Sequence, residues 1–140
     1  MLNMKDEEAK KEFGDRLHIA ALGVVVEKDK FRVAHDGTHR VLVNHRIRVR
    51  DQARSPTAGE IRTLMRERQE DYGGARQFAL LGDVSKAHRR VVVRRADWGL
   101  QACRLSPGSV WVDCVGTYGI GSAGYGWARL AAGLLVRLFY

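Results

Sequence analysis

The residue of this chain best placed to bind a metal ion is Asp83, an acid that follows an apolar stretch. The preceding residues, Phe78-Ala-Leu-Leu-Gly82, have the composition of a buried strand, and small and polar residues follow Asp83. An ionised carboxylate at such a position needs a cation nearby, because burying an unpaired charge is unfavourable. A carboxylate is also a hard oxygen ligand of the kind that Mg²⁺ prefers. Two interpretations stay open: a ligand at a Mg²⁺–triphosphate site, or a structural ion-pair partner of Arg89 or Arg90.

A second pattern, Gly119-Ile-Gly-Ser-Ala-Gly124, is a literal G-x-G-x-x-G between an expected strand and an expected helix. In dinucleotide-binding folds such glycines let a pyrophosphate approach the N-terminus of the helix. That fold also needs an acidic residue about 20 residues further on to bind the ribose. No acid follows Asp113 in this chain, so a dinucleotide-binding half-domain is the less favoured alternative.

Zinc and hydrolase motifs are weak. His35, His39 and His45 lie near one another in the sequence, but Cys103 and Cys114 do not have metal-ligand spacing. The nucleophile elbow G-x-S-x-G does not occur. Two unpaired cysteines and a charged N-terminus without a signal peptide predict an intracellular protein, nuclear or cytoplasmic and not secreted.

The composition predicts a polyanionic partner. The chain has 140 residues, enough for one domain, and a net charge of +8 from 24 basic and 16 acidic residues. Eighteen of the basic residues are arginine, whose planar guanidinium binds phosphate in two-pronged geometry. Nucleic acid is the expected partner, with solubility alone as the other explanation of the charge. Arg129 and Arg137 interrupt the apolar C-terminal run below the roughly 18 residues that span a bilayer, so no membrane partner is expected.

The first half of the chain predicts a charged surface helix over 3–16, a buried strand over 19–26 and a second strand over 31–35. The run Val41–Arg50 also reads as a strand, because its second half alternates strictly between basic and apolar residues. In a strand, this alternation places Ile47 and Val49 on one face and three arginines on the other, namely Arg46, Arg48 and Arg50.

The second half predicts two helices and a strand. Thr57-Ala-Gly-Glu60 has capping-box form, so a helix should run to about Gln69, end at Gly73-Gly74, and turn three side chains inward. These are Ile61, Leu64 and Met65. A strand is expected over 109–115, and a final helix from residue 122 should carry Trp127, Leu130, Ala131, Leu134 and Leu138 on one side. The last residues are apolar and uncapped, so we expect the chain to be truncated.

Three blocks, taken in order, resemble the reverse transcriptase domain of retroelements, an RNA-directed DNA polymerase. Phe31-Arg-Val-Ala-His-Asp-Gly-Thr38 is similar to the family's fingers segment, aromatic-Arg then Asp-x-Arg, with Thr38 in place of the second Arg. Asp83-Val-Ser-Lys-Ala-His-Arg-Arg-Val91 is similar to the first palm motif, Asp-Leu-x-x-Ala-aromatic. Thr117–Leu130 is similar to Pro-Phe-Gly-Leu-x-Asn-Ala-Pro-x-x-Phe-x-Arg-Leu. Together the blocks span about residues 20–140.

The resemblance implies an α+β fold, the fingers and partial palm of a right-hand polymerase, with an antiparallel sheet and packed helices. The implied divisions are a charged N-terminal segment (1–16), the first part of the fingers (17–77), a palm strand with Asp83 (78–90), the second part of the fingers (91–121) and a truncated palm helix (122–140).

The resemblance also implies site residues. Asp83 would be the catalytic residue and a ligand of Mg²⁺ or Mn²⁺, assisted by the backbone carbonyl of Val84. Arg32, helped by Lys30 or Lys28, would hold the triphosphate. Further contacts to the incoming nucleotide would come from Lys86, Ala87, His88, Tyr118 and Gly119. The arginine face of Arg46, Arg48 and Arg50 would follow the backbone of an RNA or DNA template–primer.

The chain departs from the family in ways that limit its activity. His88 stands where the family has Tyr or Phe, which puts sugar discrimination in doubt. The Tyr-x-Asp-Asp motif is absent and no Asp-Asp dipeptide occurs, so the metal site is expected only in a complete polymerase domain. We therefore expect a fragment that is inactive alone and whose longer parent supplies the rest of the palm and the thumb. The main alternative is a non-catalytic basic nucleic-acid-binding module.

Overall fold

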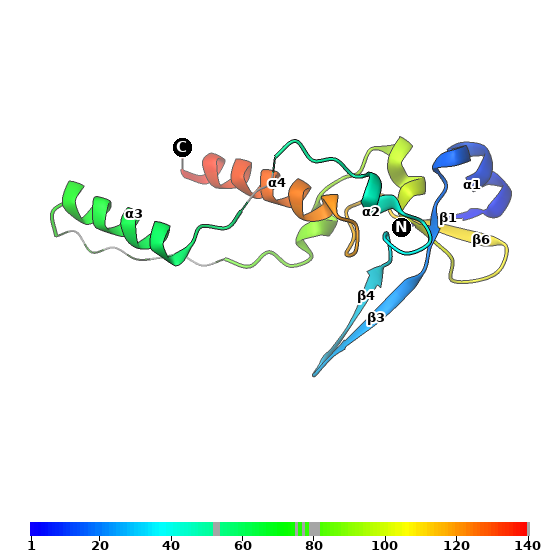
Figure 1. Ribbon diagram of the computed structural model, residues 1–140, viewed down its shortest axis with the longest axis horizontal. Coiled ribbons are helices and arrows are strands. Elements are labelled where there is room, and N and C mark those ends of the chain that lie inside the picture. The colour runs from blue at the N-terminus through cyan, green and yellow to red at the C-terminus, as the bar shows by residue number, and fades with distance from the viewer. Residues whose placement is uncertain (52–53, 75, 77, 79–81, 140) are drawn as a thin grey trace.

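A computed structural model describes residues 1–51, 54–74, 76, 78 and 82–139 of the chain. It shows a mixed α+β fold with a four-stranded sheet, a two-stranded hairpin and packed helices (Figure 1). The expected α+β class is therefore confirmed.

The four-stranded sheet has the order β1-β6-β5-β2. β6 pairs antiparallel with both β1 and β5, whereas β2 and β5 form a short parallel pair. The helical segments α1 and η3 contact the sheet, and the short segment η1 contacts both of them. The bounds are β1 Leu2–Lys5, α1 Asp6–Phe13, η1 Gly14–Arg16, β2 Ile19–Ala20, η3 Arg95–Gln101, β5 Ala102–Cys103 and β6 Ser109–Val112.

The core lies between α1 and this sheet. Ala9 and Phe13 from α1 meet Ala102, Val110 and Val112 from the strands, and all five are buried. The sequence predicted α1 and β6, but the short strand β1 that precedes α1 was not expected. It forms because the extended backbone of residues 2–5 pairs with β6.

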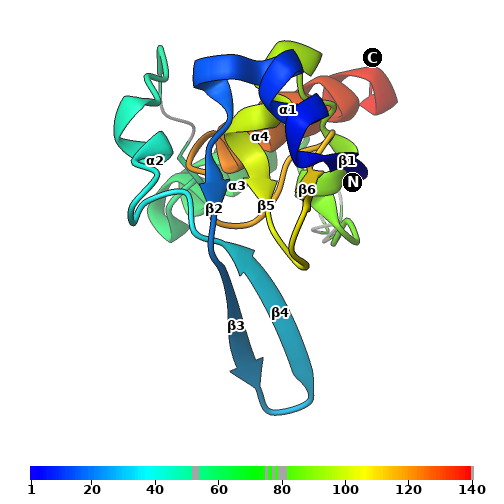
Figure 2. The same ribbon diagram turned by 90° about the vertical axis from the view of Figure 1, so that its right-hand side faces the viewer.

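The strand expected over 19–26 is divided: Ile19–Ala20 form β2 of the four-stranded sheet, where Ala20 is buried, and β3 (Leu22–Glu27) forms a projecting hairpin with β4 (Lys30–His35), the strand expected over 31–35 (Figure 2). Its turn falls at residues 28–29, between the two expected strands. The prediction of a buried strand is wrong for β3, because most of its side chains are exposed. The apolar composition of this segment does not reflect burial within the chain.

The strand expected over 41–50 is wrong. Residues Val43–Arg46 form a helical turn, α2, and residues 47–50 continue as irregular chain. The backbone reverses at Leu42, which has a left-handed φ of 53°. Side-chain hydrogen bonds of Asn44 then hold α2 against a distant turn, so tertiary bonding overrides the alternating pattern.

Helix α3 (Ala58–Asp71) begins at Thr57 with the predicted capping box and gives way to a turn at residues 72–74. The expectation that its apolar residues face inward is wrong, because Ile61, Leu64 and Met65 are all exposed. Within the described residues no other helix or strand packs along α3 (Figure 1).

The buried strand expected before Asp83 is also wrong where it can be followed. Ala79, Leu80 and Leu81 lie outside the described residues, and residues 82–84 are irregular and exposed. A 3-10 helix, η2 (Ala87–Arg90), follows after Lys86, whose φ of 55° is left-handed. This turn leaves the palm-like block as loop and helix rather than strand.

The last helix, α4 (Ser122–Phe139), is confirmed, and its first turns pack against η2. Its apolar side is buried only at the start, where Ala123 is buried. Leu130, Leu134 and Leu138 are exposed, so the expected inward stripe is wrong beyond the first turns. No described helix is both long enough and apolar enough to cross a membrane.

Candidate functional site

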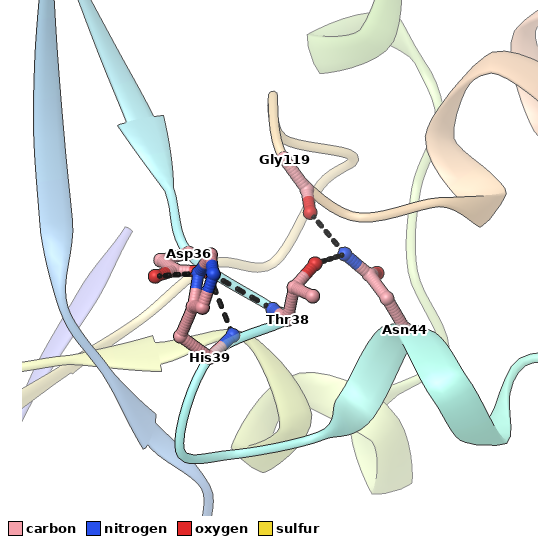
Figure 3. Close-up of polar contacts among 5 residues, drawn as sticks. All are labelled: Asp36, Thr38, His39, Asn44 and Gly119. Carbon is pink, nitrogen blue, oxygen red and sulfur yellow. Dashed lines mark hydrogen bonds and ion pairs between the residues drawn. The ribbon is translucent and has the colours of Figure 1, made fainter.

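The block that resembles the fingers segment and the block that resembles the nucleotide-contacting turn are joined by Asn44. We call the contact between loop 36–44 and turn 116–121 the junction (Figure 3). The Asn44 amide Nδ2 donates to the carbonyl oxygen of Gly119 at 2.7 Å and to Thr38 Oγ1 at 2.9 Å. The backbone N–H of Gly121 donates to Asn44 Oδ1 at 2.8 Å. One side chain therefore fixes two segments that lie about 75 residues apart in the sequence.

Loop 36–44 is shaped by its own acid, Asp36. The carboxylate accepts hydrogen bonds from the backbone N–H groups of His39 at 3.0 Å and Thr38 at 3.1 Å, and the His39 ring pairs with it (Figure 3). These contacts, chiefly the His39 N–H, lower the pKa of Asp36. Asp36 thus orders the loop that Asn44 closes.

Gly119 is required at the centre of the junction. Its φ of +95° is in the left-handed region, and an added Cβ would overlap the carbonyl oxygen of His35. The backbone N–H of His35 donates to the carbonyl of Tyr118 at 2.9 Å. Only a glycine lets the turn approach the end of β4 this closely.

The palm-like block, residues 83–91, reaches the same turn. The rings of His88 and Tyr118 lie edge to face with centroids 4.9 Å apart. A Cβ on Gly116 would lie 2.6 Å from the carbonyl oxygen of His88, and the Gly116 N–H donates to Val91 at 2.9 Å. All three blocks therefore converge on turn 116–121, where Tyr118 and Gly119 are exposed to solvent.

The buried acid of this region is Asp113, which follows β6. It is 3% exposed, and Arg89 Nη1 donates to its Oδ1 at 2.9 Å. Arg89 was considered as a partner of Asp83, but it pairs with Asp113 instead. The sequence places Asp113 between Val112 and Cys114 in an expected strand. This local pattern does not indicate which cation pairs with Asp113.

His35 is buried at the base of the hairpin, and neither ring nitrogen has a hydrogen-bond partner among the described residues. Burial lowers the pKa of His35, and the charges of Asp113 and Asp36 oppose this effect. The fold thus favours the neutral ring.

We expect the stability of the chain to fall as the pH drops below about 6.5. There the unfolded chain binds a proton at His35 that the folded chain still excludes, so acidification favours unfolding by up to about 1.4 kcal/mol per pH unit. The stabilisation is complete above that pH. Urea unfolding at a series of pH values measures the slope, which His35→Leu should reduce and the exposed control His45→Leu should not. Equal slopes in wild type and His35→Leu would contradict this.

The other expected site residues lie apart from the junction. Asp83 and Val84 are exposed on the segment before η2. Arg32 lies on the hairpin, where its Nε donates to Glu27 at 3.0 Å, and Lys30 lies beside the hairpin turn. Lys86 is exposed and Ala87 half-buried next to His88. The structure thus brings His88, Tyr118 and Gly119 together and leaves the two expected triphosphate ligands on the hairpin.

The described residues do not fit a catalytic Mg²⁺ site. No three histidine, cysteine or acidic side chains among them are grouped closely enough to hold a metal ion. Asp83 supplies one exposed carboxylate, and Asp113 is engaged by Arg89. His35, His39 and His45 form no such group either.

Residues 46–50 do not form a strand, but their side chains still alternate between exposed and half-buried. Arg46, Arg48 and Arg50 are exposed, whereas Ile47 and Val49 are half-buried. Arg48 Nη1 donates to the carbonyl of His45 at 2.9 Å, and Arg48 remains exposed. This arginine segment (46–50) begins two residues after Asn44 and therefore adjoins the junction.

The G-x-G-x-x-G pattern is split between a turn and a helix. Gly119 and Gly121 belong to the junction, and Gly124 lies in α4. The preceding strand, β6, pairs antiparallel with both neighbours, whereas the dinucleotide fingerprint follows a strand of a parallel sheet.

Comparisons with known protein families, with curated proteins and with solved structures found no match to this chain.

Proposed function

We propose that this chain is the fingers and partial palm of a reverse-transcriptase-like protein, and that by itself it binds nucleic acid without transferring nucleotides. The observation that carries the proposal is the convergence of three blocks on turn 116–121. Residues 31–38 reach it through His35, residues 83–91 through His88, and residues 117–130 contain it. In the family that the chain resembles, these blocks share one site.

The chemistry at this turn suits a nucleic acid or nucleotide. Tyr118 is 42% exposed and its ring is steadied by His88, so a base can stack on it. The exposed arginine segment beside the junction supplies guanidinium groups for phosphates. Stacking and phosphate contacts read no base edge, so we propose binding with little sequence preference.

Nucleotidyl transfer would require carboxylates from outside these 140 residues. One acid, Asp83, is the candidate ligand that this chain would contribute, and the described segments hold no group of three histidine, cysteine or acidic side chains that could complete a metal site. The proposal therefore separates a binding role of this chain from the catalytic role of a longer parent protein. RNA or DNA template–primer is the proposed partner, with a deoxynucleoside triphosphate as substrate of the complete domain.

Single-stranded RNA and DNA of unrelated sequence should bind the purified chain with similar affinity, and the affinity should fall steeply with salt. Neutralising phosphates releases counterions, so the logarithm of the binding constant falls linearly with the logarithm of salt concentration. Fluorescence anisotropy measures this. The same preparation should not extend a primer with Mg²⁺ or Mn²⁺; salt-independent binding, or extension that survives contamination controls, would contradict the proposal.

A further inference from the structure

A cavity of about 350 Å³ adjoins the junction, and its walls come from α2, residues 91–93, η3, turn 116–121 and the start of α4. Most of the wall is apolar, with Val43, Leu100 and Ile120 among the lining side chains. A volume of this size is typical of small-molecule sites. Since a water molecule occupies about 30 Å³ in the liquid, the cavity has room for about a dozen non-hydrogen atoms.

Gln101 is the buried polar side chain of this wall. It is only 4% exposed, and its Nε2 donates a long hydrogen bond of 3.4 Å to the backbone carbonyl of Asp113. Within the part of the chain that the structure describes, its Oε1 accepts no hydrogen bond. Because buried amide oxygens are normally hydrogen-bonded, this wall favours an occupant that donates an N–H or O–H to Gln101.

The uncompensated charge at the cavity is that of Arg48, which lines the wall and is exposed. Two uncharged backbone carbonyls hold its Nη1 in place, at 2.9 and 3.3 Å. The acid of the wall, Asp97, already pairs with Arg16 and Arg94. The solvent-exposed side of the cavity therefore favours an anion.

We propose that this cavity binds a small amphipathic carboxylate. Such a ligand has an apolar body of about a dozen non-hydrogen atoms, a hydroxyl or N–H at one end and a carboxylate at the other. The donor lies at Gln101, where the wall is buried, and the carboxylate pairs with Arg48 on the exposed side. The apolar side chains between them cover the body of the ligand, which is the part that gains most from leaving water.

Other ligand classes fit these walls less well. A neutral ligand leaves Arg48 uncompensated. A cation is repelled by the net charge of +8, and the carboxylate of Asp97 is already engaged by two arginines. A purely apolar ligand leaves the buried oxygen of Gln101 without a donor, which is unfavourable.

Isothermal titration calorimetry without nucleic acid tests the site, with 10-hydroxydecanoate as an aliphatic probe and indole-3-propionate as an aromatic one. At least one probe should bind one site per chain with a dissociation constant of about 1 mM or tighter, as expected for a ligand of this size. Whichever probe binds identifies the kind of apolar body that the cavity takes.

Matched compounds test the two polar contacts. Decanoate and 1-methylindole-3-propionate lack the donor, and the primary amides of the two probes lack the charge. Each should bind at least about 3-fold more weakly than its parent, because each loses a hydrogen bond or an ion pair to the wall. A wild type that binds the parent probes no better than these compounds would overturn the proposal.

Variants of the wall locate the contacts. Gln101→Leu should abolish the preference for the donor, and Arg48→Gln should abolish the preference for the acid over its amide. Arg90→Gln makes the same change at an exposed arginine outside the cavity and should bind like wild type. Circular dichroism checks the fold, and if Gln101→Leu does not fold, the exposed Arg48 still decides the test.

Two results would contradict the site. One is a dissociation constant above about 10 mM for both probes. The other is an Arg48→Gln variant that still prefers the acid as strongly as wild type does. Neither result would touch the proposed nucleic-acid binding, because the assay contains no nucleic acid.

Discussion

Gly119→Ala is expected to destabilise the chain by at least about 3 kcal/mol, among the largest losses for a single substitution. The new Cβ would overlap the carbonyl oxygen of His35, which is backbone and cannot move away as a side chain would. The left-handed φ of +95° adds strain for any residue other than glycine. Urea unfolding followed by circular dichroism measures the loss.

Two further glycines serve as controls, and they separate the cost of the atomic overlap from the cost of the backbone strain. Gly108 has a φ of +78° but open space around its Cβ position, so Gly108→Ala should lose only about 1–2 kcal/mol. Gly124 lies in α4 with nothing near its Cβ position, so Gly124→Ala should stabilise the helix slightly. If Gly119→Ala were no worse than Gly108→Ala, the close approach of the turn to β4 would be wrong.

Arg89→Leu is expected to cost about 3 kcal/mol, because it leaves the carboxylate of Asp113 without its cation. The Asp113 side chain is only 4% exposed and cannot be rehydrated without disturbing the end of β6. Thermal or urea unfolding checks this value.

Arg90→Leu is the neighbouring control, since Arg90 is exposed on the same 3-10 helix. It should change stability by less than about 0.5 kcal/mol, the range of ordinary surface substitutions. Asp83→Asn should be equally mild because Asp83 is exposed. A large loss for Asp83→Asn with none for Arg89→Leu would show that the ion pair had been assigned to the wrong acid.

Local signals in the sequence predicted the elements that local physics determines. The capping box of Thr57 and Glu60 predicted the start of α3, and two apolar runs predicted two successive strands, whose paired parts are β3 and β4. Both depend on hydrogen bonds or backbone preferences within a few residues.

Burial could not be predicted in the same way, because it depends on what covers an element. Val24–Val26 and Ile61 have the composition of core residues, yet no described element packs on them. For Arg46–Arg50 the alternation correctly predicted which side chains are exposed but not the secondary structure. Long-range bonds from Asn44 decided that.

The candidate site was predictable in part. The glycine-rich turn was singled out, and Gly119 is constrained there by the close approach of the His35 carbonyl. Asp83 was singled out for an apolar strand whose central residues, 79–81, lie outside the described residues, and residues 82–84 are irregular. Asp113 and Asn44 were missed as organising residues because their partners, Arg89 and Gly119, are distant in sequence.

The salt dependence of single-stranded RNA binding, measured for wild type and two triple variants, tests the proposed function most directly. Replacing Arg46, Arg48 and Arg50 with Ala should weaken binding and make the log–log salt slope shallower by about 2, since each phosphate contact contributes about 0.7. Replacing Arg62, Arg66 and Arg68 of α3 with Ala removes the same charge and should leave the slope unchanged. Equal slopes for all three proteins, or a shallower slope in the α3 variant alone, would contradict a nucleic-acid surface beside the junction.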